Sequence, residues 1–257
     1  MKKYFIVSDV HSFFDELMVA LNDAGFEMSN PAHHLIVCGD LFDRGDKTVE
    51  LFEFIKELQT QGRLIYIKGN HEDLLFDCIE EIRRGYTPGY HHRSNGTIKT
   101  ICQFCDQNEW IIYDPTWRDK ICETMQPVLD FINAHCVDYA EIGDYIFVHG
   151  YIPCWSHLDD FREADESDWH EARWLNGMDM WRNSKNRVEG KTIVVGHWHC
   201  SWGWSHIRQE CKEWPQKNRM DWQKSFEPFI DDGIIAIDAC TAYSGIINCI
   251  TLEVKDE

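Results

Sequence analysis

The chain has 257 residues and carries 44 Asp and Glu residues against 25 Lys and Arg residues, so its formal net charge is −19. This acidic excess argues against nucleic-acid binding, because contacts to a phosphate backbone need clustered Lys and Arg. The composition, 44% hydrophobic and 27% charged, is typical of a globular protein. No apolar run reaches the roughly 20 residues of a membrane span. We therefore expect a cytoplasmic protein without a membrane segment.

The N-terminal third of the chain predicts three strands that alternate with three helices. Short β-branched and aromatic runs indicate the strands, and apolar residues at helical spacing indicate the helices. In chain order the predicted elements are strand 3–8, helix 13–21, strand 34–38, helix 48–58, strand 64–67 and helix 72–82. Such alternation is typical of βαβ units and a largely parallel sheet.

The rest of the chain predicts a helical insert followed by a second set of strands. Short strands are predicted at 137–142, 145–148, 191–195, 233–237 and 246–254. Because these closely spaced strands follow the βαβ half, we predict a second sheet packed on the first. The expected fold class is α/β, a two-sheet β-sandwich flanked by helices. We expect a single domain over residues 1–257, with a mostly helical insert at about 85–134.

Polar residues able to bind a metal ion stand directly after five of the predicted strands. The five blocks are Asp9–His11, Gly39–Gly45, Gly69–Glu72, His149–Gly150 and Gly196–His199. Because open α/β folds bind ligands at the carboxyl ends of their strands, we expect these blocks to meet at one edge. Each block alone is more typical of a capped turn or a hydrogen-bonded core histidine. Their joint occurrence after strands favours a metal site.

The candidate metal ligands combine oxygen and imidazole donors. They are Asp9, His11, Asp40, Asn70, His149, His197 and His199. This mixture suits two divalent ions, with manganese expected and iron or zinc as alternatives, better than it suits calcium, which prefers oxygen throughout. Asp40 is the natural bridge between two ions, an arrangement that serves phosphoryl displacement. Two such ions would supply the positive charge that an acidic protein needs in order to bind phosphate.

In order and residue type, the five blocks resemble the calcineurin-like metallophosphoesterase superfamily. Two stretches, Asp43-Arg44-Gly45 and Asn70-His71-Glu72, narrow the resemblance to the phosphoprotein phosphatase branch, which includes bacterial serine/threonine phosphatases and symmetrical dinucleoside tetraphosphate hydrolases. The resemblance implies two sets of metal ligands. The first set is Asp9, His11 and Asp40, and the second is Asp40, Asn70, His149 and His197. His199 matches a ligand that related phosphodiesterases use on the first metal and that protein phosphatases usually lack.

The resemblance also implies roles in catalysis and substrate binding. His71 would be the general acid that protonates the leaving oxygen, with its ring oriented by Asp43. Arg44 would hold the phosphate bidentately, a geometry that Lys cannot provide. Asn70 would lie against the substrate as well as the second metal.

A second phosphate-binding arginine is expected after the fourth block. Arg173 is the candidate, and Arg162 and Arg182 are alternatives. Two residues depart from the family pattern, because Ser12 and Tyr151 stand where smaller residues are usual. These bulkier side chains predict a narrower pocket and leave the metal chemistry unchanged.

The expected reaction is hydrolysis of a phosphomonoester, carried by a protein or a small molecule, through direct attack of a metal-activated hydroxide. A dinucleoside polyphosphate hydrolase or a phosphodiesterase is the alternative, and His199 favours the phosphodiesterase. A non-catalytic, metal-binding regulatory module is an alternative of a different class. Two features stay open: His91-His92 could contact substrate or belong to a loop, and the Trp-rich segment 198–222 has no assigned role.

Overall fold

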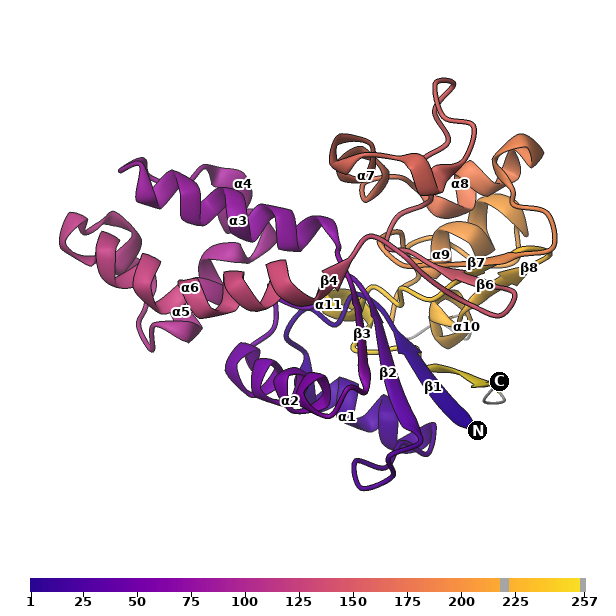
Figure 1. Ribbon diagram of the computed structural model, residues 1–257, viewed down its shortest axis with the longest axis horizontal. Helices are drawn as coiled ribbons and strands as arrows, with labels where there is room; N and C mark the ends of the chain where they lie inside the picture. Colours follow the sequence, from indigo (N-terminus) through magenta and orange to yellow (C-terminus); the bar gives the residue numbers. More distant parts are fainter. Residues whose placement is uncertain (218–221, 255–257) are drawn as a thin grey trace.

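Two five-stranded sheets pack face to face, with helices on their outer faces (Figure 1). The computed structural model describes residues 1–217 and 222–254. Its architecture confirms the predicted α/β fold class, a β-sandwich flanked by helices. The two ends of the described chain lie side by side, because the last strand pairs with the first.

The first sheet contains the predicted βαβ units. Its strand order is β10-β1-β2-β3-β4, with β1 to β4 parallel and β10 antiparallel to β1. The strands are β1 (Lys2–Val7), β2 (His33–Cys38), β3 (Leu64–Ile67), β4 (Cys136–Val137) and β10 (Ile250–Val254). The connecting helices are α1 (Phe14–Asp23), α2 (Thr48–Thr60) and α3 (Asn70–Arg83). Parallel pairing therefore brings the carboxyl ends of β1, β2 and β3 to one edge.

The second sheet has a parallel centre with antiparallel strands at both edges. Its strand order is β5-β6-β7-β9-β8. The strands are β5 (Ala140–Ile142), β6 (Tyr145–Phe147), β7 (Thr192–Val195), β8 (Phe229–Asp231) and β9 (Ile234–Ala236). The helices of this half are α7 (Glu166–Ala172), α8 (Gly177–Arg182), α9 (Cys200–Trp202), α10 (Trp222–Phe226) and α11 (Thr241–Ser244), with short helical turns at Phe161–Glu163, Ser184–Asn186 and Gly203–Ile207.

The core has three layers, because side chains alternate between the two faces of each strand. Between the sheets lie Ile6, Ile36, Ile67, Phe147 and Val194, all buried. The opposite face of the first sheet packs against α1, α2 and the helices that follow, and that of the second packs against α7, α8 and α9. This double burial explains why the central strands read as continuous apolar runs.

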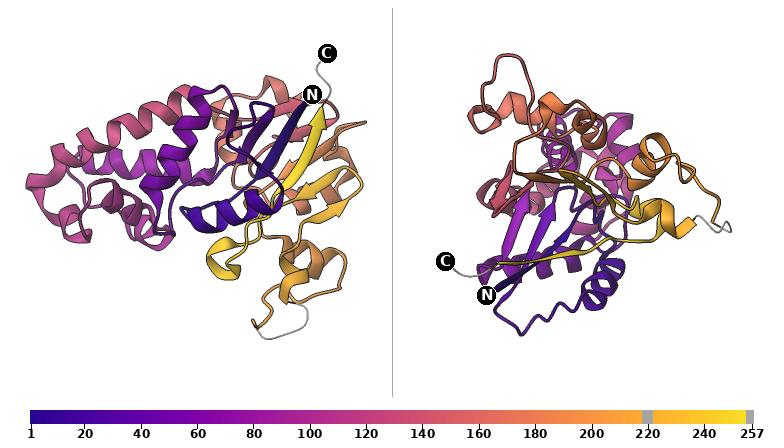
Figure 2. Two further views of the ribbon diagram at one scale, coloured as in Figure 1. Left: turned by 90° about the horizontal axis from the view of Figure 1, so that it is seen from below. Right: turned by 90° about the vertical axis from the view of Figure 1, so that its right-hand side faces the viewer.

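The stretch predicted as a helical insert forms a group of helices at one end of the sandwich (Figures 1 and 2). It contains α4 (Tyr90–Asn95), α5 (Thr97–Phe104), α6 (Arg118–His135) and short turns at Glu109–Tyr113 and Pro115–Trp117. Helices α4, α5 and α6 all contact α3, so the group is anchored to the helix that begins with the third polar block. Among the described residues no helix is long and apolar enough to cross a membrane.

Three details of the second set of strands differ from the sequence prediction. The strand predicted at 246–254 is β10, which joins the first sheet by pairing with β1 and is not part of the second. The single strand predicted at 137–142 is two strands, and they belong to different sheets: β4 pairs with β3, and β5 pairs with β6. The chain crosses from one sheet to the other between them. Strand β8 was not predicted. Strands β4, β5 and β8 have only two or three residues each, too few for a period-two pattern to be recognised.

Candidate metal centre

The loops at the carboxyl edge adopt strained backbone conformations. Asp9, His11, Asp40 and His197 all have positive φ, between 50° and 61°. Of the ten non-glycine residues with positive φ in the described part of the chain, eight belong to loops that follow β1, β2, β7 or β9. Such conformations cost about 1–3 kcal/mol each and persist only where surrounding contacts enforce them. Their concentration marks this edge as the functional one.

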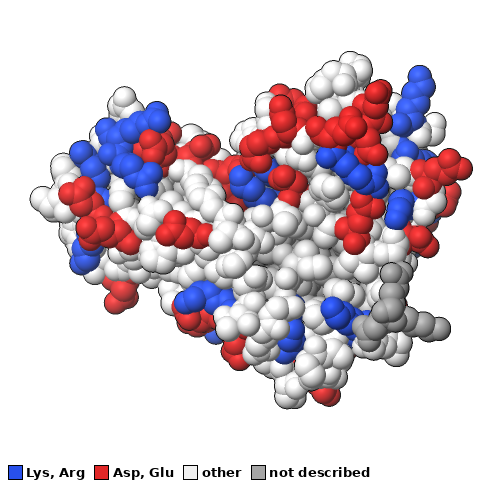
Figure 3. Space-filling model, viewed as in Figure 1, with Lys and Arg blue, Asp and Glu red and all other residues white. Residues whose placement is uncertain are grey.

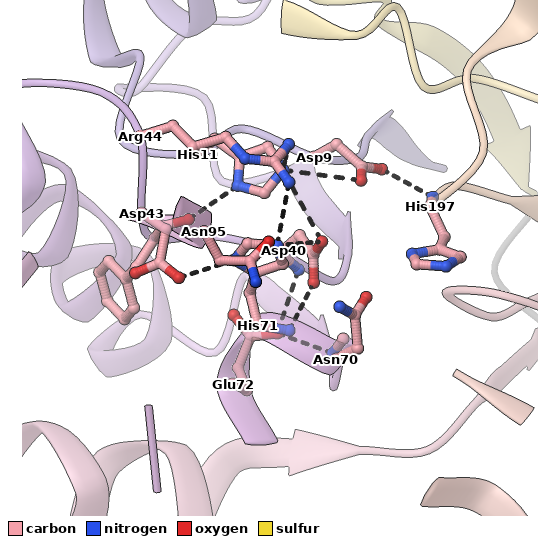
Figure 4. Close-up of polar contacts among 12 residues, drawn as sticks. Asp9, His11, Asp40, Asp43, Arg44, Asn70, His71, Glu72, Asn95 and His197 are labelled. Atoms are coloured by element: carbon pink, nitrogen blue, oxygen red, sulfur yellow. Dashed lines mark hydrogen bonds and ion pairs between the residues drawn. The ribbon is translucent and has the colours of Figure 1, made fainter. Parts of the chain in front are cut away.

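Asp40 lies at the centre of the converging side chains (Figure 4). Its Oδ1 is 3.2 Å from His149 Nε2 and accepts a hydrogen bond of 3.0 Å from the backbone N–H of His71. Its Oδ2 is 3.7 Å from His11 Nε2. Two groups of possible metal ligands share Asp40, one with His11 and His71 and one with His149 and His197, and within each group the ligand atoms lie within 4.8 Å. This is the geometry that a bridging carboxylate requires.

Two of the histidines are held in the tautomer that binds metal. His11 Nδ1 donates to the carbonyl of Phe42 at 2.9 Å, and His149 Nδ1 donates to the carbonyl of Cys38 at 2.8 Å. In both rings Nε2 therefore carries the lone pair and faces Asp40. Burial, followed by the nearby charge of Arg44, lowers the pKa of His11 well below its usual value, which keeps its ring neutral. Neutral imidazoles beside a shared carboxylate fit divalent metal ions.

Two further predicted ligands, Asn70 and Asp9, join this centre from the first sheet and contact residues of the second. Asn70 begins α3 and places its Oδ1 2.9 Å from His149 Nε2. Asp9 Oδ2 accepts a hydrogen bond of 3.0 Å from the backbone N–H of His197, so the loops after β1 and β7 are directly connected.

Burial raises the pKa of Asp40 to about 6, with opposing effects from neighbouring histidines. A bound cation would favour its charged form.

His199 lies apart from the two groups that share Asp40. Its Nδ1 is 2.7 Å from Ser201 Oγ, and its Nε2 is 3.7 Å from Glu213 Oε1. The ring of Trp214 covers it at a centroid distance of 4.4 Å. The described contacts of His199 thus belong to the segment after β7, and its role as a metal ligand stays a prediction.

His71 and Asp43 form a closely coupled pair beside Asp40. His71 Nδ1 donates to Asp43 Oδ2 at 2.6 Å, which leaves Nε2 facing the centre, 3.8 Å from Asp40 Oδ2. Burial lowers the pKa of His71, but the charges of Asp40 and Asp43 and the hydrogen bond outweigh it, so the pKa is raised. Thr97 and Thr100 donate hydroxyl hydrogen bonds to Asp43 at 3.0 Å and 2.7 Å. This geometry suits an oriented proton donor.

Neither threonine was recognised from the sequence, although a local signal exists. Thr97 and Thr100 are three residues apart at the start of α5, so both hydroxyls lie on one helix face. The sequence Asn95-Gly96-Thr97 predicts a turn at the same place. Gly96 does form that turn, with φ 96°, and packs against the backbone N of Arg44.

The Arg44 side chain reaches across the centre (Figure 4). Its Nη1 is 2.9 Å from His11 Nε2, and its Nη2 is 3.2 Å from His71 Nε2. Its backbone carbonyl accepts a hydrogen bond of 2.8 Å from Lys99 Nζ on α5. The guanidinium therefore lies where it could meet the oxygens of a phosphate bound beside Asp40.

Arg173 occupies a different environment from Arg44. Its side chain is only 2% exposed and pairs with Asp73 at 2.9 Å, Asp138 at 2.5 Å and Glu166 at 3.1 Å. Because three carboxylates hold its guanidinium, its predicted role as a second phosphate contact has no support in these contacts and stays a prediction. The two alternatives are also paired: Arg162 binds Glu141 and Asp160, and Arg182 binds Asp179.

Two further buried carboxylates shape the centre. Glu72 accepts four hydrogen bonds, from the backbone N–H groups of Asp40, Leu41 and Gly69 and from the Tyr66 hydroxyl. It thereby holds the loops after β2 and β3 together. Asp238, after β9, is 5% exposed, and burial together with the charge of Asp9 raises its pKa well above the usual value. Its position after a strand of the same edge was the signal that could have identified it.

Comparison with known proteins agrees with this geometry. The family model for calcineurin-like phosphoesterases matches residues 2–228. The chain belongs to this family. A relative from Vibrio vulnificus named symmetrical bis(5'-nucleosyl)-tetraphosphatase is 38% identical, over 98% of this chain and 95% of the relative. An asymmetrical bis(5'-nucleosyl)-tetraphosphatase from Bacillus velezensis is 35% identical over 30% of this chain, and the match spans about a third of that relative's length.

Solved structures share the fold of this family member at low sequence identity. A crystal structure of a putative diadenosine tetraphosphatase has a TM-score of 0.53 and 14% identity, covering 97% of this chain and 89% of the other. A cold-active protein-tyrosine phosphatase from a Shewanella species has a TM-score of 0.50 and 16% identity, covering 98% of this chain and 76% of the other. At these identities the likeness shows the fold alone.

Proposed function

We propose that this family member is a dinuclear-metal-dependent phosphoesterase that hydrolyses a phosphomonoester, carried by a protein or a small molecule. The observation that carries the proposal is the position of Asp40 in both groups of possible ligands, with the His71–Asp43 pair beside it. Asp40 and Asp43 raise the pKa of His71, whose Nε2 faces the centre. Such a proton donor serves catalysis, and a non-catalytic binding module would have no use for it.

The side chains divide the work of the proposed reaction. When bound, two divalent ions would activate a water molecule as nucleophile and balance the charge of the phosphate. Asp9, His11 and Asp40 would hold one ion, and Asp40, Asn70, His149 and His197 the other. Arg44 would orient the phosphate through its two Nη groups, and His71 would give its Nε2 proton to the leaving oxygen. The mixed oxygen and imidazole donors favour manganese, with iron or zinc as alternatives.

A dinucleoside polyphosphate is the second candidate substrate. The relative from Vibrio vulnificus that matches almost the whole chain is named for that activity. Trp174 and Trp214, which are 45% and 52% exposed, contact the rings of His197 and His199 at centroid distances of 5.8 Å and 4.4 Å. Exposed indole faces beside the metal edge could stack on a nucleobase, an interaction worth about 1–3 kcal/mol.

The face in Figure 3 supports a discrete phosphate substrate over a nucleic acid. Lys and Arg side chains on this face are interspersed with Asp and Glu and form no continuous basic patch. A nucleic-acid backbone would need such a patch.

We extend the proposal to a cytoplasmic location, where small phosphates and phosphoproteins are available.

Turnover of p-nitrophenyl phosphate with added Mn²⁺ tests the proposed activity. The wild-type chain should hydrolyse it, and His71→Asn should lower kcat by about 10²–10⁴-fold, the usual contribution of a general acid, while metal content is retained. Metal-loaded protein without turnover on any phosphomonoester, diester or dinucleotide would support a non-catalytic module instead. Comparing rates on diadenosine tetraphosphate and bis-p-nitrophenyl phosphate then separates the dinucleotide and phosphodiester alternatives.

A further inference from the structure

A third cluster of metal-binding side chains lies outside the centre around Asp40. Glu81, near the end of α3, and His91 and His92, on α4, each offer a ligand atom, and these three atoms lie within 4.8 Å of one another. The side chains come from two helices that contact each other. The turn between the helices brings them together, because it ends at Gly89, whose N–H donates to Glu81 Oε2 at 3.0 Å.

His92 carries the strongest indication that a ligand belongs here. Its side chain is 0% exposed, yet neither Nδ1 nor Nε2 has a hydrogen-bond partner among the described residues. Glu81 Oε2 lies 3.6 Å from His92 Nε2, which is beyond hydrogen-bond distance. Burying a polar group without a partner costs about 1–3 kcal/mol, so buried ring nitrogens are nearly always paired. A metal ion between Glu81 and His92 would satisfy one of these nitrogens.

The orientation of His91 is a second, independent observation. Neighbouring residues on a helix normally point in different directions, about 100° apart. The rings of His91 and His92 nevertheless lie together, with a centroid distance of 3.9 Å and an interplanar angle of 43°. The His91 ring folds back over Gly89, where a Cβ would lie 2.7 Å from His91 Nδ1. Two imidazoles in contact repel each other when protonated and are compatible when both bind one cation.

We propose that Glu81, His91 and His92 form a zinc site separate from the catalytic centre. Two imidazoles and one carboxylate are a three-ligand set that zinc accepts in tetrahedral geometry, with water as the fourth ligand. Imidazole donors favour zinc over magnesium or calcium, which prefer oxygen throughout. Asp77 lies one turn before Glu81 on α3, and its charge adds to the attraction for a cation.

Zinc at this site would stiffen the element that supports Asp43. Helix α4 ends at Gly96, and α5 begins there with Thr97, whose hydroxyl bonds to Asp43. An ion that ties α4 to α3 would therefore restrain the loop that carries Asp43 and Arg44. The site is structural in this proposal, and it does not depend on the substrate of the enzyme.

Zinc content after equilibrium dialysis of the chelator-treated, full-length chain tests the site. His91→Ala and Glu81→Gln should each bind one Zn²⁺ fewer per chain than wild type. The matched control is His157→Ala, which removes another exposed imidazole that pairs with a carboxylate, Asp168, at 3.1 Å. Its zinc content should equal that of wild type. Because the side chains of His91 and His157 are largely exposed, both variants should fold.

The outcomes are decisive in both directions. Zinc should raise the Tm of wild type by about 5 °C more than that of His91→Ala, since a ligand stabilises only the state that binds it. Anomalous diffraction at the zinc edge should place an ion between Glu81 and His92. Retention of the wild-type zinc count in either variant, or loss of an ion in His157→Ala, would overturn the proposal.

Discussion

The two edges of the sandwich use glycine for opposite reasons. At the carboxyl edge, Gly69 and Gly196 are needed for space, because a Cβ at each would collide with Asp40 and Ser8 respectively, and Gly39, with φ 80°, is needed both for space against His149 and for its backbone conformation. At the amino edge, Gly62 and Gly190 have φ of 65° and 71°, and a Cβ at either would meet nothing within 4 Å. There glycine only makes a left-handed turn easy.

Non-glycine residues with a left-handed backbone gather at the carboxyl edge. At the carboxyl edge Asp9, Asp40 and His197 adopt positive φ although they carry side chains. Their strain is held by contacts such as the hydrogen bond from the backbone N–H of Asp40 to Glu72. Strained residues that carry polar side chains therefore gather at the carboxyl edge, where their side chains are held in position by surrounding contacts. Substitutions at the two edges should therefore differ sharply.

The largest effect is expected at Asp40. Asp40→Asn removes the charge shared by both groups of possible ligands. Even partners that only orient a metal ligand contribute about 10–100-fold in affinity or activity, so loss of a bridging carboxylate should lower kcat/KM by more than ~100-fold. Metal content per chain should fall in parallel. Full activity with two bound ions in this variant would contradict the bridging role.

A matched pair of glycine substitutions tests the comparison between the edges. Gly196→Ala forces a methyl group against Ser8 and Asp9, so it should destabilise by at least about 1–3 kcal/mol and also impair metal binding. The methyl group of Gly190→Ala enters open space, so the variant should lose only the cost of a left-handed alanine backbone, about 1–2 kcal/mol of unfolding free energy. Unfolding in urea measures the difference in stability. Loss of metal binding in Gly190→Ala would show that the edges are not independent.

A smaller effect is expected where the helical insert supports the proposed catalytic pair, His71 and Asp43. Thr100→Val removes the hydroxyl that donates to Asp43 at 2.7 Å and keeps the shape of the side chain. A hydrogen bond to a charged group contributes about 1.5–3 kcal/mol, so kcat should fall by roughly tenfold or more while KM changes little. Kinetics of Thr60→Val, an exposed hydroxyl on α2 that bonds to a backbone carbonyl, provide the control. An equal loss in both variants would exclude a specific role for Thr100.

The smallest effect concerns a titrating group at the amino edge. His33 begins β2 and is 9% exposed, its Nδ1 accepts the N–H of Glu27 at 3.0 Å, and burial lowers its pKa below 6.5. The folded state disfavours the protonated ring. The stabilising contribution of neutral His33 to the free energy of unfolding is therefore complete above pH 6.5 and is lost as the pH falls below that value. The unfolding free energy of wild type should therefore drop more steeply between pH 7 and 5 than that of His33→Gln. Identical slopes would exclude His33 as the cause.

The residue types and their order along the chain determined the fold class and the composition of the candidate metal centre. Each polar block directly follows a strand. Parallel pairing brings Asp40 and Asn70 to one edge of the first sheet and His149 to one edge of the second, and packing of the two sheets joins these edges. The pairing of His71 with Asp43 followed from the family resemblance and is present at 2.6 Å. These features were accessible because they depend on local patterns and on one general property of parallel sheets.

Tertiary structure alone decided which distant groups support those residues. The hydroxyl of Thr100 reaches Asp43 across 57 positions of sequence, and Arg173 reaches Asp73 across 100. Helix packing sets such contacts, and no local pattern encodes them. Packing likewise places His91 and His92 on a helix against Glu81, a partner that no local pattern indicates. Residue type shows what a side chain can do, whereas the fold selects the partner with which it does so.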